Sequence, residues 1–259
     1  MTPSEQASLA DLLHTPFINV LTYPKPSLRV ARSRIEQLRR LGVTEIVFEG
    51  HARIGRLGIL GIGTVGVVVV ARTQSGEHAL KIRRTDANRK DMSTEVKMAA
   101  MVNRIGIGPP VSAFSRDFIL MKRLAYQDID EWLRGVSGKG SRATVRSMIH
   151  AALNQCRKLD IMGIDHGQLS NLRKHLVIAE DKPWIIDFES AGNARRPRNV
   201  TSAAQYLFIG GRVSPRLRRA VGVRNTSGVV QLLTDYKRNP DDYYYSKLLE
   251  GLKLVSRSE

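Results

Sequence analysis

The chain has 259 residues, 42% of them hydrophobic and 25% charged, which is typical of a folded globular protein and not of a disordered one. No apolar run approaches the ~18 residues of a membrane-spanning helix, so we expect no membrane contact. The single cysteine, Cys156, excludes an internal disulfide, and the first residues lack the basic and apolar blocks of a secretory signal. These features together predict a cytoplasmic protein.

The charge of the chain is strongly positive. Lysine and arginine number 41 against 24 aspartate and glutamate residues, which gives a formal net charge of +17. Such a charge attracts polyanions and makes RNA or a ribonucleoprotein a candidate partner through the basic surface. General solubility accounts for the same charge equally well, because net charge governs association and not the fold.

Residues 1–43 are expected to form a helical N-terminal extension. Ser27 is suited to cap a helix that Gly42 ends. The predicted apolar face of this helix consists of Leu28, Ala31, Ile35 and Leu38. The remaining surface carries Arg29, Arg32, Arg34, Arg39 and Arg40. We expect these arginines to be solvated, although they could also contact phosphates.

The middle of the chain is predicted to be mainly β structure. Short runs rich in β-branched residues, interrupted by glycines, indicate strands. The predicted strands lie at 45–50, 56–72, 77–83 and 118–124. Turn residues at 73–76 join the second and third as a hairpin. A helix at 92–103, capped by Asp91, precedes the last strand.

Beyond residue 125 the pattern becomes mainly helical. The clearest helix, at 145–162, has a wide apolar stripe. The tyrosines at 243–245 are expected to pack within a basic helical tail rather than to stack on bases. A β-rich half followed by a helical half indicates an α+β protein in two lobes. We therefore expect an N-lobe over 44–123 and a C-lobe over 124–259.

The spacing of Gly61, Gly63 and Gly66 matches the start of G-x-G-x-x-G, which occurs in dinucleotide folds and in kinase phosphate loops. A dinucleotide fold needs a helix after the last glycine. Here valines follow at 67–70 and favour a strand. We therefore predict a hairpin turn whose backbone N–H groups cover the phosphates of ATP, with the hydroxyl of Thr64 at its tip.

Lys81 lies in the next predicted strand, on the face opposite Leu80 and Ile82. A lysine at this place can reach the α- and β-phosphates of ATP and pair with a helix carboxylate. Glu95 is the only acid in the helix predicted at 92–103. The sequence therefore predicts an ion pair between Lys81 and Glu95 at an ATP site.

Two further segments, joined by a predicted hairpin, carry the other candidate residues. Asp187 lies at the end of an apolar strand at 184–188, and an aspartate so placed is suited to bind a Mg²⁺ that bridges the β- and γ-phosphates. The other segment, at 164–171, has the character of a catalytic loop between a helix and a strand. The two segments are expected to act on the same substrate.

These segments together resemble the protein-kinase-like superfamily, most closely the RIO-type and related predicted serine/threonine kinases of archaea. The resemblance covers roughly residues 54–208 and rests on GIGTVG, HALK with Glu95, FILMKRL, IDHGQL and IIDFES. It implies a two-lobed protein-kinase-like fold that binds ATP between its lobes. It also implies that Met121 borders the adenine and that Arg123 belongs to an ATP-binding hinge. Asp187 would hold the metal.

The chain departs from the family pattern H-G-D-L-x-x-x-N. Gln168 stands where the pattern has the aspartate that orients the acceptor hydroxyl. Asn171 comes two residues before the metal-binding asparagine of the pattern, so either Asn171 or His175 would be the second metal ligand. We prefer Asn171, because an amide oxygen suits Mg²⁺ better than an imidazole does. Asp165 is an alternative acid–base group at the acceptor.

The leading hypothesis is an ATP- and Mg²⁺-dependent atypical serine/threonine protein kinase with a protein acceptor. Positioning and charge neutralisation supply most of the rate of phosphoryl transfer. Replacing the general base with Gln168 would therefore slow the reaction by about 10²–10⁴-fold without abolishing it.

Two other functions fit the same residues. In an ATPase or nucleotide-gated switch on an RNA-containing particle, Gln168 would orient water. A non-catalytic nucleotide- or nucleic-acid-binding module would have kept only the fold. The arginines after the metal site, Arg195, Arg196 and Arg198, could bind an acidic substrate segment or an RNA backbone, or could be solvated.

Overall fold

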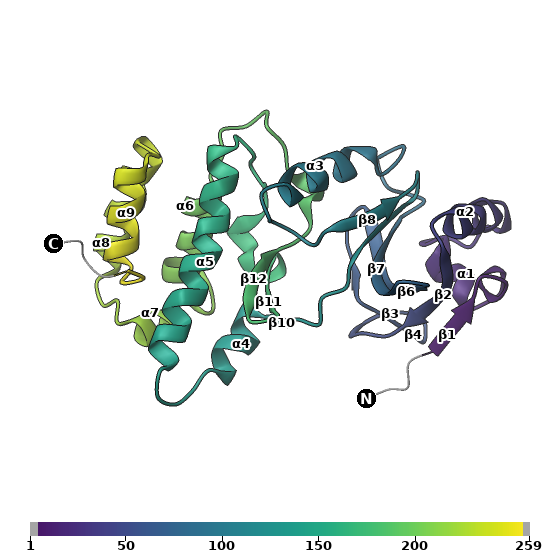
Figure 1. The fold of residues 1–259 in the computed structure, drawn as a ribbon, viewed down its shortest axis with the longest axis horizontal. Coiled ribbons are helices and arrows are strands. Elements are labelled where there is room, and N and C mark those ends of the chain that lie inside the picture. The colour runs from purple at the N-terminus through teal and green to yellow at the C-terminus, as the bar shows by residue number, and fades with distance from the viewer. Residues whose placement is uncertain (1–4, 256–259) are drawn as a thin grey trace. The chain divides into compact units, whose positions relative to one another are not determined.

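The computed structural model describes residues 5–255 (Figure 1). The chain is a mixed α+β protein with a mostly antiparallel sheet and a helical part, as the sequence predicts. It divides into two compact units. The first comprises the described residues up to Asn103 together with Pro109–Leu124. The second comprises Arg104–Gly108 and the described residues from Ala125 onward.

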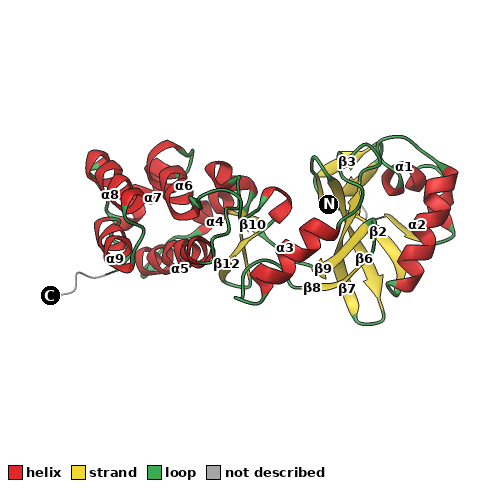
Figure 2. Ribbon diagram, turned by 90° about the horizontal axis from the view of Figure 1, so that it is seen from above, coloured by secondary structure: helices red, strands yellow, loops and turns green. Residues whose placement is uncertain are grey.

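The strands of the first unit are β1 (Glu5–Ser8), β2 (Val43–Phe48), β3 (Ala52–Ile54), β4 (Leu57–Ile59), β5 (Gly61–Ile62), β6 (Gly66–Thr73), β7 (Gly76–Arg83), β8 (Val111–Phe114) and β9 (Phe118–Lys122). The main sheet has the order β1-β2-β6-β7-β9-β8, with β5 paired to β6. Its pairings are antiparallel. Strands β3 and β4 form a separate hairpin. Figure 2 shows this concentration of strands in the first unit.

The helices of the first unit are the 3₁₀ turn η1 (Asp11–Leu13), α1 (Phe17–Leu21), α2 (Leu28–Arg40) and α3 (Ser93–Asn103). Alternate residues of the central strands face opposite sides of the sheet. Leu80 and Phe118 belong to the same buried cluster as Leu38 of α2, whereas Ile119 packs with Val96 of α3. The helices α2 and α3 therefore cover opposite faces of the sheet.

The residues expected as a helical extension are part of the first unit. Strand β1 pairs with β2, with Gln6 opposite Val47. Ala7 and Leu12 are buried in the same cluster as Leu80. The N-terminal segment thus lengthens the sheet and contributes to its core, in addition to forming the predicted helix.

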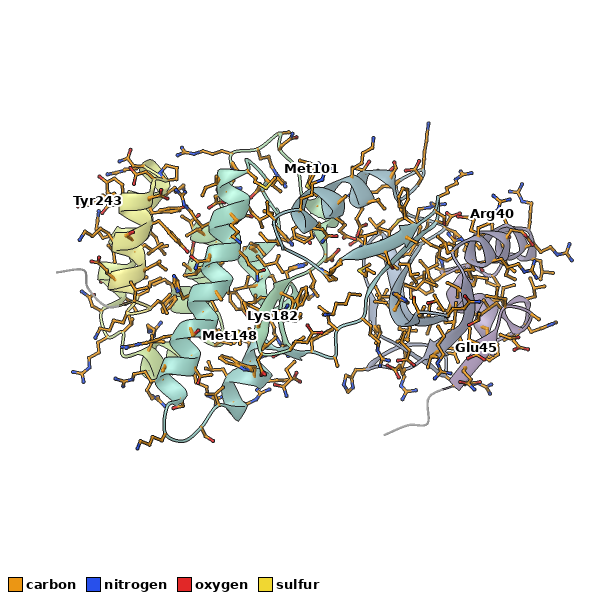
Figure 3. The ribbon with its side chains drawn as sticks, in the orientation of Figure 1. Arg40, Glu45, Met101, Met148, Lys182 and Tyr243 are labelled. Carbon is orange, nitrogen blue, oxygen red and sulfur yellow. The ribbon has the colours of Figure 1, made fainter. Side chains whose placement is uncertain are left out.

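Helix α2 confirms the predicted cap, because the hydroxyl of Ser27 accepts a hydrogen bond from the N–H of Val30. Two predictions on its faces were wrong. Leu28 is 54% exposed, since it occupies the first helical turn, beyond the edge of the core. Arg34 is fully buried rather than solvated. Arg40, by contrast, is exposed, and Figure 3 shows its side chain extending from the helix.

Arg34 is buried because its guanidinium joins three parts of the first unit. Its N–H groups donate to the carbonyl oxygens of Leu21 and Arg83 and, at 3.4 Å, to the carboxylate of Asp117. Asp117 also accepts from Arg83 at 2.8 Å and from Gln37 at 2.8 Å. Buried charges persist only where they are paired and hydrogen-bonded in this way. This network fixes α2 to the ends of β7 and β9.

The second unit is mainly helical. A small sheet contains β10 (Gln127–Asp128), β11 (Leu176–Ala179) and β12 (Lys182–Ile185), in that order. Its α-helices are α4 (Ile129–Gly135), α5 (Ser141–Ile161), α6 (Asn199–Gln205), α7 (Ser214–Val221), α8 (Thr226–Arg238) and α9 (Asp242–Gly251). The shorter turns are η2 (Leu169–Lys174), η3 (Phe188–Ser190) and the π-helical η4 (Tyr206–Gly210).

The apolar stripe predicted for α5 is buried, from Val145 to Leu159. Tyr245 of α9 is also buried, whereas Tyr243 is 63% exposed and lies on the outer side of that helix (Figure 3). The hydroxyl of Tyr245 donates to the side-chain oxygen of Asn154 at 2.8 Å. Tyr245 therefore packs within the helical tail, as predicted. Within residues 5–255, none of the helices combines the length and apolar character needed to cross a membrane.

Candidate functional site

The glycine turn of the first unit is a hairpin. Gly61 pairs with Val68, and the N–H of Gly63 donates to the carbonyl oxygen of Gly66 at 2.7 Å. The chain continues after Gly66 as strand β6, as the valine run predicts. Thr64 is exposed at the turn, where its hydroxyl is accessible. The local geometry is that of a tight hairpin turn, which is the type of element that covers nucleotide phosphates in kinases.

Arg84 stabilises this turn, and the sequence patterns gave no indication of its role. Its guanidinium donates to the carbonyl oxygen of Gly63 at 3.1 Å, and its backbone N–H donates to that of Val65 at 2.8 Å. The same guanidinium pairs with Asp86 at 2.8 Å. Hydrogen bonding to Asp86 raises the pKa of Arg84. Arg84, which directly follows β7, is thereby hydrogen-bonded to two residues of the glycine turn.

Lys81 and Glu95 form the predicted ion pair. The Nζ atom of Lys81 lies 2.6 Å from Oε1 of Glu95, and the two side chains are 7% and 6% exposed. Lys81 lies on the α3 face of the sheet, while Leu80 and Ile82 face the opposite side. Glu95 is held toward the sheet by Val96, which packs with Ile119. A buried ion pair is weak evidence for stability, because desolvation offsets the attraction.

Gly66 is required by the position of Lys81. A Cβ atom on Gly66 would lie 2.9 Å from Cγ and Cε of Lys81. Real Cβ atoms do not approach carbon so closely without displacement of a neighbour. The last glycine of the turn therefore leaves room for the lysine stem, which links the glycine pattern to the lysine position.

The two residues that the resemblance places near adenine have different surroundings. Met121 of β9 is partly buried and packs against Val96 and Met92, on the face of the sheet that carries Lys81. Arg123 pairs with Glu49 and Glu77, all within the first unit. The guanidinium of Arg123 is therefore committed to two carboxylates and orders the end of β9 rather than presenting a free cation.

In the second unit, His166 lies at the centre of the candidate loop and is fully buried. Its Nε2 lies 3.1 Å from the carbonyl oxygen of Ile186, and its backbone N–H donates to Oδ1 of Asn199 at 2.9 Å. The ring packs on His175 and Phe188 at centroid distances of 5.1 and 5.0 Å. Burial, with the neighbouring His175 ring, lowers the pKa of His166 to about 4. The imidazole is therefore neutral at pH 7.

Asp187 follows β12 in an unusual backbone conformation. Its φ of 67° and ψ of 75° lie in the left-handed region, which non-glycine residues seldom adopt. The preceding residue is fixed on both sides, because the N–H of Ile186 donates to the carbonyl oxygen of His175 at 2.9 Å and its carbonyl accepts from His166. Backbone strain of this kind, held in place by its surroundings, is concentrated at functional sites.

Gln168 and Asn171 lie on the loop and on the turn η2 that follows it. The side-chain oxygen Oε1 of Gln168 is buried and has no hydrogen-bond partner among residues 5–255. Asn171 is exposed, and its N–H donates to the carbonyl oxygen of Gln168 at 3.0 Å. Asn171 also leaves helical geometry, with φ −112° and ψ 61°. The loop therefore bends at the residue that we prefer as second metal ligand.

Asp165 and His175, the two alternatives, have structural partners. The carboxylate of Asp165 pairs with Arg195 at 3.1 Å and is 3.4 Å from the N–H of Arg198. The backbone carbonyl of His175 accepts from Ile186, and burial lowers the pKa of the His175 side chain. Asp165 therefore holds the loop to the segment that precedes α6. The sequence patterns did not distinguish this structural role from an acid–base role.

Asp187 and Asn171 of the second unit carry oxygen donors, the kind of ligand that Mg²⁺ prefers. Within the described chain, residues 5–255, no cluster of three His, Cys, Asp or Glu side chains is arranged around a common point. Magnesium in nucleotide enzymes is typically held by one or two protein oxygens together with phosphate oxygens and water. Asp187 and the amide of Asn171 are donors of this kind.

The comparisons with known proteins add one relative. No protein family model matches the chain. An uncharacterized protein of Methanocaldococcus jannaschii is 28% identical to it over 110 residues, which are 42% of this chain and 94% of that protein. That similarity is to a protein of undetermined activity, so it assigns no chemistry.

Proposed function

We propose that the protein is an ATP- and Mg²⁺-dependent phosphotransferase, an atypical serine/threonine protein kinase whose acceptor is a protein. The observation that carries the proposal is the buried Lys81–Glu95 ion pair next to the glycine turn. A buried lysine paired with a helix carboxylate, beside a glycine hairpin turn, is a typical arrangement for gripping phosphate. The proposal includes a cytoplasmic location.

The first unit would bind the nucleotide. Lys81 would contact the α- and β-phosphates while Glu95 holds its ammonium group in place. The N–H groups of the turn at 61–66 would cover the phosphates, and Met121 would contact the adenine. Because Arg123 is paired with two glutamates, we assign it to ordering the strand end and not to contact with the nucleotide.

The second unit would supply the metal and acceptor groups. Asp187, with Asn171 as second ligand, would hold Mg²⁺, which neutralises charge on the β- and γ-phosphates when bound. The clamp of Ile186 by His166 and His175 supports this assignment, because it fixes the direction in which Asp187 leaves the strand. Gln168 would align the acceptor hydroxyl through Oε1, the oxygen that has no partner among residues 5–255.

The same unpartnered oxygen favours a second candidate function. An amide oxygen can align a water molecule as readily as a serine hydroxyl, as a glutamine does in GTPases. The protein would then be an ATPase or a nucleotide-gated switch, and the net charge of +17 would attach it to an RNA-containing particle.

The two functions are separated by following the γ-phosphate of radiolabelled ATP. We expect label on the protein itself or on an added acceptor protein, with Mg²⁺ required. Lys81→Ala and Asp187→Ala should each abolish the label, whereas Lys97→Ala, an exposed lysine on α3, should not. Release of labelled phosphate with no labelled protein would instead establish the ATPase. Unchanged ATP binding and turnover in Lys81→Ala would exclude both.

A further inference from the structure

The second unit contains a hollow of about 170 Å³ where the last turn of α5, the segment before α6 and the end of α8 meet. Its cationic lining residues are Arg157, Arg196, Arg198 and Lys237. Asp160 is the one acidic residue among the described residues that line it. This clustering concentrates positive charge in a recess rather than on a flat solvated face.

Two of these cations have no internal partner. The side chains of Arg198 and Lys237 are exposed and form no hydrogen bond or ion pair with another residue of the described range 5–255. Arg157 is 11% exposed and is fixed by the carbonyl oxygen of Pro240 at 2.7 Å and by Asp242 at 3.0 Å. The recess thus combines a rigid guanidinium with two free cations at its mouth.

The single acid in the lining offsets the charge of at most one of these four cations. The carboxylate of Asp160 accepts from the backbone N–H groups of Asn199 and Val200 at 2.9 and 3.2 Å, and from the side-chain amide of Asn199 at 2.7 Å. Its lone pairs are therefore used within the protein, and burial raises its pKa. The recess remains a site for an anion.

The residues that line the recess indicate which kind of anion it can bind. Recognition of bases in single-stranded RNA commonly uses exposed aromatic faces on which the bases stack. The aromatic residue in this lining, Tyr236, is 2% exposed, and its hydroxyl is bonded to Arg157. The rim instead offers apolar surface, from Pro197 and from Ile161, which is 66% exposed. Such a rim suits the carbon stem of a side chain that ends in a phosphate.

We propose that this hollow binds the phosphate monoester of a phosphorylated serine or threonine in a partner protein segment. Arginine and lysine donors that line one recess match the three terminal oxygens of a monoester. The site is distinct from the residues proposed to bind ATP, and its occupation requires no nucleotide.

Arg198, which lines the hollow, and its neighbour Asn199 are hydrogen-bonded to the candidate loop. Asn199 accepts from the N–H of His166 at 2.9 Å and donates to the carbonyl oxygen of Ile164 at 2.6 Å. The N–H of Arg198 lies 3.4 Å from the carboxylate of Asp165. A phosphorylated segment in the hollow would therefore be anchored on residues that are hydrogen-bonded to the loop that carries Gln168, where an acceptor protein has to be presented.

The test is binding of a fluorescently labelled peptide that carries one phosphoserine, followed by anisotropy with the full-length chain and without nucleotide. We expect binding that the unphosphorylated peptide does not show. The double variant Arg198→Ala/Lys237→Ala should weaken it by at least about tenfold, because charge-assisted hydrogen bonds are lost. Arg216→Ala/Arg219→Ala removes the same charge from exposed positions on α7 and should change the affinity by less than about twofold.

Four outcomes would overturn the proposal. Equal binding of the unphosphorylated peptide, or unchanged affinity in Arg198→Ala/Lys237→Ala, would remove the site. Inorganic phosphate that binds as tightly as the phosphopeptide would make it a site for the free ion. A short single-stranded RNA that needs Arg198 and Lys237, with no binding of the phosphopeptide, would assign the hollow to RNA. Because ATP is absent, each of these results is independent of the proposed kinase reaction.

Discussion

The imidazole Nε2 of His166 lies 3.1 Å from the carbonyl oxygen of Ile186, the residue immediately before Asp187. The opposite side of the same residue is also held, since its N–H donates to the carbonyl of His175. His166 and His175 precede the hairpin of β11 and β12, and Ile186 follows it. Contacts across this hairpin therefore fix the peptide that leads into Asp187. The left-handed backbone of Asp187 follows this clamped peptide directly, and the imidazole that holds the peptide is fully buried.

The protonation of His166 should therefore control stability at acid pH. Its pKa is lowered to about 4 in the folded chain by burial, against ~6.5 in an unfolded one. The unfolded chain binds the proton first, so this contribution is complete above about pH 6.5 and is lost as the pH falls toward 4. We expect the free energy of unfolding to fall by on the order of 3 kcal/mol over that range from this group.

Urea denaturation at several pH values measures this effect. His166→Asn should be less stable at pH 7 and should lose less stability between pH 7 and pH 5 than the wild-type chain does. His51→Asn, at an exposed position, should keep the wild-type pH dependence. An identical loss in His166→Asn and in the wild-type chain would show that another group is responsible.

Replacing one partner of the Lys81–Glu95 pair should lower the free energy of unfolding. Glu95→Leu removes the carboxylate that pairs with the buried ammonium of Lys81, and we expect a loss of about 3–5 kcal/mol in chemical denaturation. The double variant Lys81→Met/Glu95→Leu replaces the pair with apolar groups and should recover most of that loss. A double variant no more stable than Glu95→Leu would show that the pair is not coupled. The double variant should still fail to bind ATP.

The parts of the fold that follow from local patterns could be predicted from the sequence. The valines after Gly66 favour a strand through their branched side chains, and the structure has β6 there. The stripe on α5 and the cap at Ser27 depend on spacing and on one hydroxyl, and both are present. The pairing of Lys81 with Glu95 could be predicted because the helix at 92–103 contains a single acid.

Features that depend on distant contacts could not be predicted. Arg34 has the helical position of a surface residue, and its burial is explained by the carbonyl groups of Leu21 and Arg83 and the carboxylate of Asp117, which folding brings together. Strand β1 has no strong alternation of polar and apolar residues, and its pairing with β2 decides its conformation. Likewise, nothing in the sequence near Asp165 indicates that Arg195 pairs with it.

Substitution of Gly66 should test the space that Lys81 needs. In Gly66→Ala the new methyl group would meet Cγ and Cε of Lys81 at 2.9 Å, so the lysine or the turn has to move. We expect a loss of about 1–3 kcal/mol in thermal or urea denaturation, together with weaker nucleotide binding. Gly61→Ala adds a methyl group with no atom within 4 Å and should have little effect on stability. Equal stability of both variants would contradict this role for Gly66.

Arg34 should be indispensable to the first unit. Arg34→Met removes the donors to Leu21 and Arg83 and leaves Asp117 with fewer cationic partners. We expect a loss of about 3–5 kcal/mol in urea denaturation, because a buried charge loses its partner. Arg32→Met, at an exposed position on the same helix, should change stability by less than about 0.5 kcal/mol. Similar losses in the two variants would mean that the burial of Arg34 is not what stabilises α2.

Gln168 is the residue at which the proposed kinase and the proposed ATPase make opposite predictions. If Oε1 aligns a serine hydroxyl, Gln168→Asp should provide a general base and raise phosphate transfer to protein by up to about 10²-fold, with a rate that rises with pH as the carboxylate ionises. Gln168→Ala should reduce transfer in either case. If Oε1 aligns water, Gln168→Asp should change phosphate release without labelling protein. Both rates are measured in one experiment with ATP labelled at the γ-phosphate, by separating free phosphate from protein at each time point.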